Sequence, residues 1–350
     1  MRTDFATLSA ATLLAMPENR PERLFAGGPD QVRKAYRLLA MKWHPDRSSD
    51  PDALAVFQHI GRLAGQAQER IRLGDWPCPG TAGFAALDGR RYQINYLRRH
   101  RFELGTLYVA NRVVAFEIAA EHADLVAQAE HTIAALRYAD DGMRAQVAAH
   151  LPAYPFAGAF RTATAFVVVL RKSPDQLLLR DVLEHFQGRL DARHVAWVVS
   201  SLLNLCCYLQ YAGLAHNALS PDTCFMSPRA HSVALLGGWW YAARIGERMR
   251  AAPAATLAWG PYGLHDSGRA DIRTDLELVR ALGRELLGDV GGTRLARDHA
   301  APRAMIDWLR LPASSDPIEE YRTWRTRVLH DSFGARRFAE LPLTPSDIYL

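Results

Sequence analysis

The stretch "PDQVRKAYRLLAMKWHPDR" runs from Pro29 to Arg47. Placed on a helix at about 100° per residue, its large apolar side chains fall on one narrow stripe that must pack on another element. Pro followed by Asp is typical of a first helical turn, and His44 precedes Pro45, which disfavours helical backbone. The stretch therefore predicts an amphipathic helix that ends at a His-Pro-Asp loop. The stripe consists of Val32, Tyr36, Leu39 and Trp43.

A second helix is predicted after this loop, beginning near Pro51. Its apolar residues also recur at helical spacing. On the first helix, Arg33, Lys34 and Arg37 lie together well off the apolar stripe. We therefore expect two antiparallel helices joined by a short loop beside a basic face. The apolar residues of the second helix are Leu54, Phe57, Ile60, Leu63 and Ala64.

This pattern resembles the J-domain of the DnaJ co-chaperone family. The matching segments are Ala35-Tyr36-Arg37, Leu39-Ala40, Trp43-His44-Pro45-Asp46-Arg47 and Phe57. The resemblance implies that the loop and the basic helix engage a DnaK-type chaperone and stimulate its ATP hydrolysis. The residues that it assigns to chaperone binding are His44, Pro45, Asp46, Arg33, Lys34, Arg37, Lys42 and Arg47.

The chain also departs from that family's pattern. The first helix, near Arg20 to Phe25, looks short, and Ala64 and Ala67 stand where an Ala-Tyr pair is usual. The Gly/Phe-rich linker and the cysteine-rich zinc module of full DnaJ proteins are missing. The alternative for this region is a helical hairpin that has lost partner binding. We favour the working J-domain because a His-Pro-Asp loop serves no evident packing need.

The stretch "YLQYAGLAHNALSPDTCFM" (Tyr208 to Met226) follows an apolar helix that Gly213 ends well. It resembles the catalytic loop of protein kinases, H-R-D-L-x-x-x-N. His216 keeps the frame of that motif, but Ala218 stands at the position of the catalytic Asp and Thr223 at that of the magnesium-binding Asn. Alanine cannot accept a proton, and a hydroxyl is a poor replacement for a metal-binding amide.

Further kinase-like motifs follow in the expected order, each degenerate. Gly105 matches the last glycine of the phosphate loop, and Glu117 replaces the phosphate-binding lysine, where it would repel phosphates. Glu130 matches the partner glutamate of that lysine. Gly237 stands at the Asp of the D-F-G segment. Asp275 matches the aspartate that anchors the catalytic loop, and we expect it to hold that loop together with His216.

The fold class that we expect is α+β and multidomain: a small helical J-domain hairpin, then a bilobal protein-kinase-like fold with a β-rich small lobe and a helical large lobe. The alternative, an unrelated α+β domain, leaves the ordered motif series unexplained. The expected boundaries are an N-terminal extension over 1–19, the J-domain over 20–75, a linker over 76–89, the small lobe over 90–171, the large lobe over 172–340 and an extended C-terminal tail over 341–350.

Composition narrows the function classes. The 350 residues are 49% hydrophobic and 23% charged, which is typical of a globular protein of two or three domains. No run approaches the apolar length needed to cross a bilayer, and there is no signal-peptide pattern, so we expect a cytoplasmic protein. The cysteines lack paired C-x-x-C spacing, so we expect no metal, disulfide or cofactor. The net charge of +5 comes from scattered arginines, which favours a solvated surface over nucleic-acid binding.

We therefore expect a co-chaperone or adaptor that recruits a DnaK-type chaperone and stimulates its ATPase. Its kinase-like domain would bind a client or partner protein. It would be catalytically dead, because the base, the metal ligands and the lysine that phosphoryl transfer needs are missing together. Trp239 and Trp240 are expected to fill the vacant nucleotide cleft, with an exposed partner patch as the alternative. A divergent active kinase would need Asp222 or another acid as base. A structural scaffold or viral assembly component is the third possibility.

Overall fold

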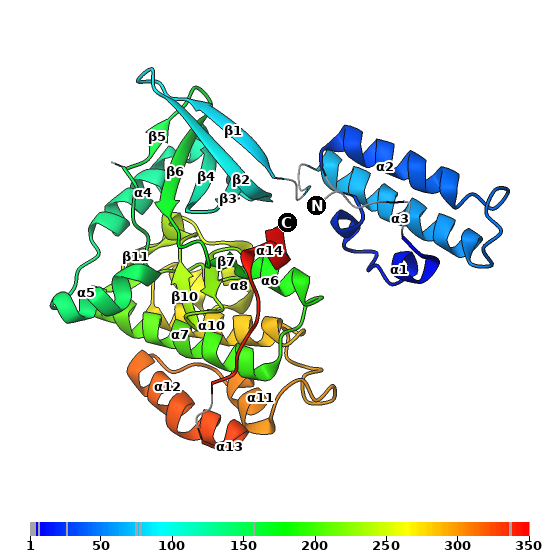
Figure 1. Ribbon diagram of the computed structural model, residues 1–350. Coiled ribbons are helices and arrows are strands. Elements are labelled where there is room, and N and C mark those ends of the chain that lie inside the picture. Colours follow the sequence, from blue (N-terminus) through cyan, green and yellow to red (C-terminus); the bar gives the residue numbers. More distant parts are fainter. Residues whose placement is uncertain are drawn as a thin grey trace. The chain divides into compact units, whose positions relative to one another are not determined.

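The computed structural model describes residues 5, 8–25, 27–73, 76, 79–156, 158–335 and 338–349, without the side chain of His265 (Figure 1). The chain divides into two compact units. The first comprises residues 1–110 together with Tyr349, and the second comprises residues 111–348.

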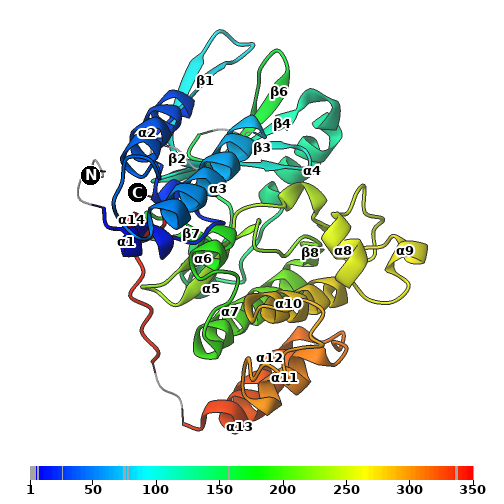
Figure 2. The same ribbon diagram turned by 90° about the vertical axis from the view of Figure 1, so that its right-hand side faces the viewer.

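The first unit opens with a helical head, which comprises α1 (Ala10–Leu14), a 3-10 helix (Pro21–Arg23), α2 (Pro29–Lys42) and α3 (Ala53–Arg72). Helices α2 and α3 lie side by side (Figure 2). Val32 and Leu39 of α2 and Ile60 and Leu63 of α3 are fully buried between them, and Trp43 closes the end of this core. The two predicted helices and the buried stripe of α2 are confirmed, but Leu54 of the predicted α3 stripe is 55% exposed, and Ala53 and Val56 are buried instead.

The head begins earlier than the sequence suggested. The expected N-terminal extension contains α1, whose Ala10 and Leu13 are buried in the same core as α2 and α3. The Ser9 side chain caps α1 by accepting a hydrogen bond from the N–H of Thr12. A helix this short has too little apolar periodicity to be found from sequence. The predicted short helix near Arg20 is a single 3-10 turn.

The expected linker over 76–89 contains a strand. Gly80–Ala85 form strand β1, which pairs antiparallel with β2 (Arg91–Phe102). Trp76 is buried in the head, and its Nε1–H donates to the carbonyl of Gly27 at 2.8 Å. Glycine and proline content suggested a loop here, but the backbone hydrogen bonds of β2 override that local preference. Residues 77 and 78 of the linker lie outside the described residues.

Strands follow where the sequence placed the small lobe. In the first unit, β2 also pairs with β3 (Gly105–Ala110), so β1, β2 and β3 form an antiparallel meander. In the second unit, β4 (Val113–Ala119) pairs with β6 (Ala165–Arg171), and the short β5 (Phe160–Arg161) pairs with the other edge of β6. Helices α4 (Ala123–Ala134) and α5 (Asp141–Val147) connect β4 to β5. The predicted strands are confirmed.

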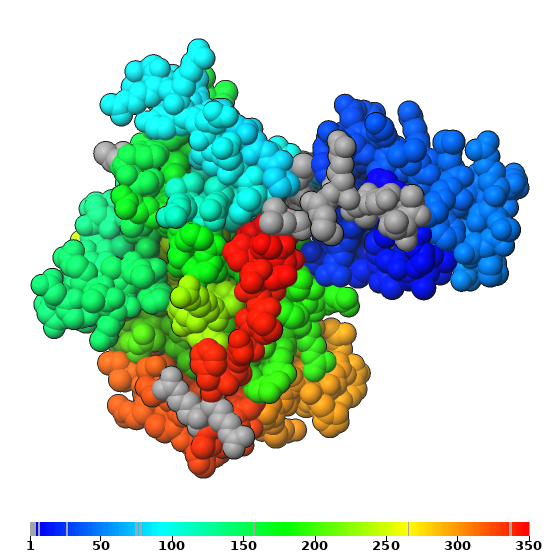
Figure 3. Space-filling model, in the orientation of Figure 1, coloured from blue at the N-terminus to red at the C-terminus, as the bar shows by residue number. Residues whose placement is uncertain are grey.

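The remainder of the second unit is mainly helical, as predicted. Helix α7 packs against α10 and α12. The C-terminal segment, which starts at Phe338, lies on the surface (Figure 3). The Phe338 ring stacks on the ring of His231. The segment ends in a short helix, so the tail is not extended throughout. The elements are β7 (Leu177–Leu178), α6 (Leu179–His185), α7 (Ala192–Ala212), β8 (Leu214–Ala215), β9 (Cys224–Ser227), β10 (Ser232–Leu235), a 3-10 helix (Trp239–Tyr241), β11 (Ala243–Arg244), α8 (Ala254–Trp259), α9 (Leu264–Ser267), α10 (Ile272–Leu286), α11 (Arg303–Arg310), α12 (Pro317–Thr323), a π-helix (Trp324–Val328), α13 (Leu329–Phe333) and α14 (Pro345–Tyr349).

Helix α7 corrects the expectation that no segment is apolar enough to cross a bilayer. It has 21 residues, and its apolar window has a mean hydropathy of 1.4. By length and composition alone it could span a membrane. More than half of that window is buried within the protein, as in the core helix of a folded domain.

We predict that Leu39→Ala destabilises the head by about 2–5 kcal/mol, because it empties a fully buried site in the core. Leu38→Ala is the matched control, since the neighbouring Leu38 side chain is 50% exposed. Hydrogen exchange of the α2 and α3 amides in the full chain measures the free energy of opening. Equal effects of the two substitutions would contradict the placement of Leu39 in the core.

Candidate functional site

The His-Pro-Asp loop follows directly on α2 and projects its polar side chains into solvent. The His44 ring packs edge-on against Phe57 of α3, with ring centroids 5.4 Å apart. Its Nδ1 accepts a hydrogen bond from the backbone N–H of Asp46 at 3.2 Å. The Asp46 side chain is 87% exposed. The loop is therefore braced from α3 while its carboxylate is presented to solvent.

A basic surface lies beside this loop on α2. Arg33, Lys34 and Arg37 are exposed and line one shallow pocket, as the sequence predicted. Arg33 is paired with Asp30 of the preceding turn at 2.5 Å. Lys42 does not line this pocket, because its ammonium group donates to the carbonyls of Phe5 and Leu8, each at 3.1 Å.

Two apolar residues on this surface were not singled out from the sequence. Leu38 and Met41 are 50% and 58% exposed. Leu38 follows Lys34 by four residues and Met41 follows Arg37 by four, so each apolar side chain stands next to a cation on the helix surface. Because these two residues lie off the apolar stripe of the helix, the sequence could have indicated that their side chains are exposed. The predicted basic face is thus a mixed basic and apolar surface.

The loop after α7 in the second unit is held by Asp275. The Asp275 carboxylate accepts hydrogen bonds from the backbone N–H of His216 at 2.7 Å and from that of Asn217 at 2.8 Å. Asp275 lies in the first turn of α10 and is fully buried. Burial raises the pKa of Asp275 to about 7, and the two N–H donors oppose that rise. The predicted anchoring role is confirmed.

His216 is a structural part of the same loop. Its Nε2 lies 2.9 Å from the carbonyl of Gly237, and its ring packs edge-on against Trp239. Burial lowers the pKa of His216 to about 4, so the ring is neutral at physiological pH. A neutral imidazole can donate Nε2–H to that carbonyl. Both of these contacts tie the loop to the segment after β10.

Thr223, which the resemblance places at the magnesium-binding Asn, is engaged in local hydrogen bonds. The Thr223 hydroxyl donates to the carbonyl of Ala218 at 2.7 Å and accepts from the N–H of Ser220 at 3.0 Å. Ala218, at the position of the catalytic base, is buried. Asp222, the candidate alternative base, forms an ion pair with Arg180 at 2.7 Å. The Thr223 hydroxyl and the Asp222 carboxylate are therefore already engaged.

Gly237 has no room for the carboxylate that a D-F-G segment carries. A Cβ atom built on Gly237 would lie 3.0 Å from Thr223 Cα and 3.3 Å from Phe116 Cζ. Gly238 has a φ of 80°, and a Cβ there would lie 2.8 Å from His216 Cε1. An aspartate at either position would require its surroundings to move.

Phe116 precedes Glu117, the residue that the sequence places at the lysine position, in β4. Phe116 is the residue of β4 that reaches Gly237, and its ring packs edge-on against Trp240 at 4.9 Å. Successive side chains of a strand point to opposite faces, so Glu117 does not share the Phe116 face. Trp239 and Trp240 are both buried, so the core interpretation is confirmed and the exposed patch is wrong.

The side chains of Glu130 and Lys172 form hydrogen bonds with backbone groups. Glu130 of α4 accepts a hydrogen bond from the N–H of Ala159 at 2.7 Å. Lys172, the only lysine of the second unit in the printed sequence, donates to the carbonyls of Ser173 and Gln176. Gly105 begins β3 opposite Phe102 in the β2–β3 hairpin. The structure thus uses Glu130 to hold the loop before β5.

Comparison with known proteins shows where this chain has relatives. No protein-family model matches it. It is 31% identical over 86 residues to "DnaJ homolog subfamily B member 9" of Homo sapiens, covering 25% of this chain and 35% of that protein. It is 38% identical over 61 residues to "Chaperone protein DnaJ" of Methanothermobacter thermautotrophicus, covering 17% of this chain and 16% of that protein. The chain thus matches about a third or less of the length of these relatives.

Among solved structures, the chain is similar to a twitchin kinase fragment of C. elegans, described as an autoregulated protein kinase with immunoglobulin domains. The TM-score is 0.45 at 13% identity, and the match covers 67% of this chain and 57% of that chain.

The head carries the motif residues that the sequence matches in these DnaJ proteins, arranged as two packed helices with an exposed loop between them. The second unit has the sheet-then-helices order of the expected kinase-like fold. The N-terminal part of this chain is homologous to DnaJ proteins, and strands followed mainly by helices come after it.

Proposed function

We propose that this protein is a J-domain co-chaperone or adaptor that recruits a DnaK-type chaperone and stimulates its ATPase. The observation that carries the proposal is the exposed His-Pro-Asp loop at the end of α2, in a segment homologous to DnaJ proteins. His44 is braced against Phe57, and Asp46 is presented to solvent. A preorganised loop loses less conformational freedom on binding than a mobile one.

The basic surface of α2 supplies the second part of this proposal. Lys34 and Arg37 are exposed, with Leu38 and Met41 beside them. Cations accelerate encounter with an acidic partner surface, and the apolar side chains add area to bury on docking. A DnaK-type chaperone that binds here would therefore meet both the loop and this surface.

We further propose that the second unit is a catalytically dead module that binds a client or partner protein in the cytoplasm. Phosphoryl transfer depends on a base, metal ligands and a cation at the phosphates. At the corresponding places the resemblance puts Ala218, Thr223, Gly237 and Glu117, and the first three are committed to packing or local hydrogen bonds. The ring of Phe116 lies against Gly237 and Trp240, where a nucleotide would need space.

The first prediction concerns chaperone stimulation. The wild-type chain should accelerate single-turnover ATP hydrolysis by the cognate DnaK-type chaperone, and His44→Gln should return the rate to the unstimulated value. His131→Gln, the same change at an exposed histidine of α4, is the control and should stimulate like wild type. Stimulation by His44→Gln equal to that of wild type would refute the role of the loop. A scaffold function would be favoured if well-folded wild-type protein gave no stimulation.

The second prediction concerns nucleotide. Mg-ATP should leave the denaturant unfolding of the full chain unchanged, because the side chains of Phe116 and Trp240 fill the space beside Gly237. A ligand present at about 100 times its Kd would stabilise the folded state by about 2.7 kcal/mol, which this measurement resolves. A saturable stabilisation by Mg-ATP would contradict the dead-module proposal and favour a divergent kinase.

The third prediction concerns Asp275, whose role we take to be structural. Asp275→Asn should lower the free energy of unfolding by about 1–3 kcal/mol, because the amide NH₂ faces one of two backbone donors and leaves it unsatisfied. Asp266→Asn is the control at an exposed position. Neither variant should change chaperone stimulation by the head. An unfolding free energy of Asp275→Asn equal to that of wild type would show that the carboxylate does not anchor the loop.

A further inference from the structure

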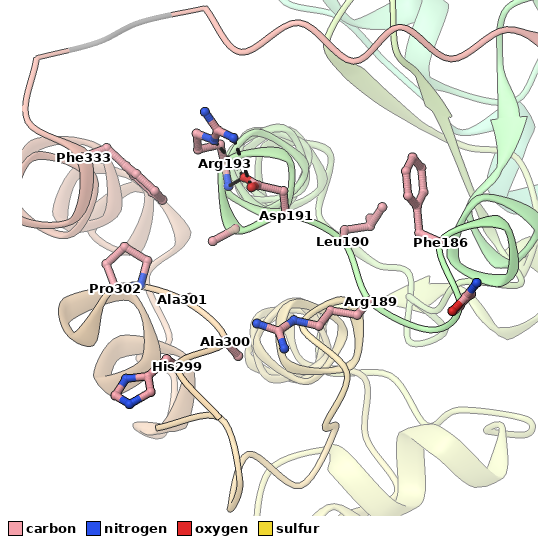
Figure 4. Close-up of a pocket in the computed structure, with 12 residues that line it drawn as sticks. Phe186, Arg189, Leu190, Asp191, Arg193, His299, Ala300, Ala301, Pro302 and Phe333 are labelled. Carbon is pink, nitrogen blue, oxygen red and sulfur yellow. Dashed lines mark hydrogen bonds and ion pairs between the residues drawn. The ribbon is translucent and has the colours of Figure 1, made fainter. Parts of the chain in front are cut away.

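The second unit has a groove on its helical part, which we name the α6–α7 groove (Figure 4). One wall is the segment that joins α6 to α7, and the other is the segment before α11 together with the end of α13. Its volume is about 850 Å³, which is ample for several side chains of a bound segment. It lies apart from the His216 loop, whose residues do not line it. The lining residues used below are Phe186, Arg189, Leu190, Asp191, Arg193 and Phe333.

The groove has an apolar floor. Leu190 is almost fully buried beneath it, and Phe186 and Phe333 are half-buried at opposite sides. Pro302 and Ala300 continue the apolar surface between them. Partly exposed aromatic rings around a buried aliphatic side chain offer area that an apolar side chain of a ligand can cover.

The two arginines of the groove differ in their state. Arg193 is paired with Asp191 through two side-chain contacts, at 2.9 and 3.1 Å, and this pairing raises the pKa of the Arg193 guanidinium. Asp191 also caps α7 by accepting from the N–H of Arg193. In the described ranges of the chain, no carboxylate pairs with Arg189, which is exposed in the lining. Asp191, the single carboxylate of the lining, is thus paired with Arg193. The guanidinium of Arg189 has no carboxylate partner among the described residues.

Each wall of the groove contains one non-glycine residue with a positive φ angle. Gln187 and His299, one on each wall, have φ values of 57° and 47°, in the left-handed region that non-glycine residues rarely adopt. Such conformations persist only where the surrounding structure determines them. The shape of the groove is therefore set by its own packing.

We propose that the α6–α7 groove docks an acidic linear segment of a partner protein. A carboxylate of that segment pairs with Arg189, in the bidentate geometry that a guanidinium favours. A neighbouring aromatic or aliphatic side chain packs on the exposed part of the Phe333 ring. This inference rests on the adaptor role proposed above and specifies the chemistry of the partner. One unpaired arginine over an apolar floor provides too few phosphate contacts for a nucleic acid, which depends on several.

The experiment is a selection of short random peptides, displayed on phage, against the immobilised full-length protein. The enriched peptides are synthesised with a fluorescent label and titrated by anisotropy against wild type, Arg189→Glu, Phe333→Ala and Arg229→Glu. Arg229→Glu makes the same charge change at an exposed arginine outside the groove. Arg189→Ala is included as a milder variant, and circular dichroism verifies that every variant is folded.

The expected result is enrichment of peptides that combine Asp or Glu with an aromatic or aliphatic residue. Their affinity should fall roughly tenfold or more in Arg189→Glu, equivalent to about 1.4 kcal/mol. It should also fall in Phe333→Ala and stay unchanged in Arg229→Glu. Binding should weaken as salt is raised, because the contact is partly electrostatic.

Three results would overturn the proposal: no acidic enrichment, enriched peptides that bind Arg189→Glu as tightly as wild type, or competition by single-stranded nucleic acid in preference to peptide. Chaperone ATPase stimulation, measured on the same variants, separates the two proposals. Stimulation without peptide docking would refute only the docking proposal for the α6–α7 groove. Docking without stimulation would refute only the proposed co-chaperone role. Arg189→Glu should stimulate the chaperone like wild type.

Discussion

The carboxylate of Asp275 accepts hydrogen bonds from two successive backbone N–H groups, those of His216 and Asn217, inside a fully buried site. Through this contact α10 fixes the loop that leaves α7, and His216 passes the constraint on to the carbonyl of Gly237. A buried carboxylate is costly unless its charge is met by donors. The site therefore holds three chain segments in one arrangement, on which the rest of the helical part is built.

Several polar groups of this arrangement are engaged in structural contacts. The hydroxyl of Thr223 is spent on the turn, and Ala218 has no polar group. Phe116 and Trp240 pack together beside Gly237, and this apolar contact supports our proposal that the second unit carries out no phosphoryl transfer. The anchoring interaction and the packing around it account for the fold without any reaction. This is the physical basis for treating the second unit as a binding module.

The head and the body use different kinds of surface. In the head, a short loop braced by Phe57 lies next to a helix face where cations alternate with Leu38 and Met41. In the body, the α6–α7 groove combines the unpaired Arg189 with an apolar floor. Each surface pairs charge, which guides encounter and orientation, with apolar area, which supplies the favourable burial. An adaptor requires two such surfaces with separate partners.

The sequence alone determined what depends on local pattern: the two head helices, the loop at His44 to Asp46 and the strands of the sheet. It also paired Asp275 with the His216 loop through motif order. Only the tertiary structure decided that Gly80–Ala85 form a strand, that α1 belongs to the head core, and that Phe116 rather than Glu117 faces Gly237. Pairing partners, packing partners and the face of a strand are set by segments distant in the chain, so no local propensity contains them.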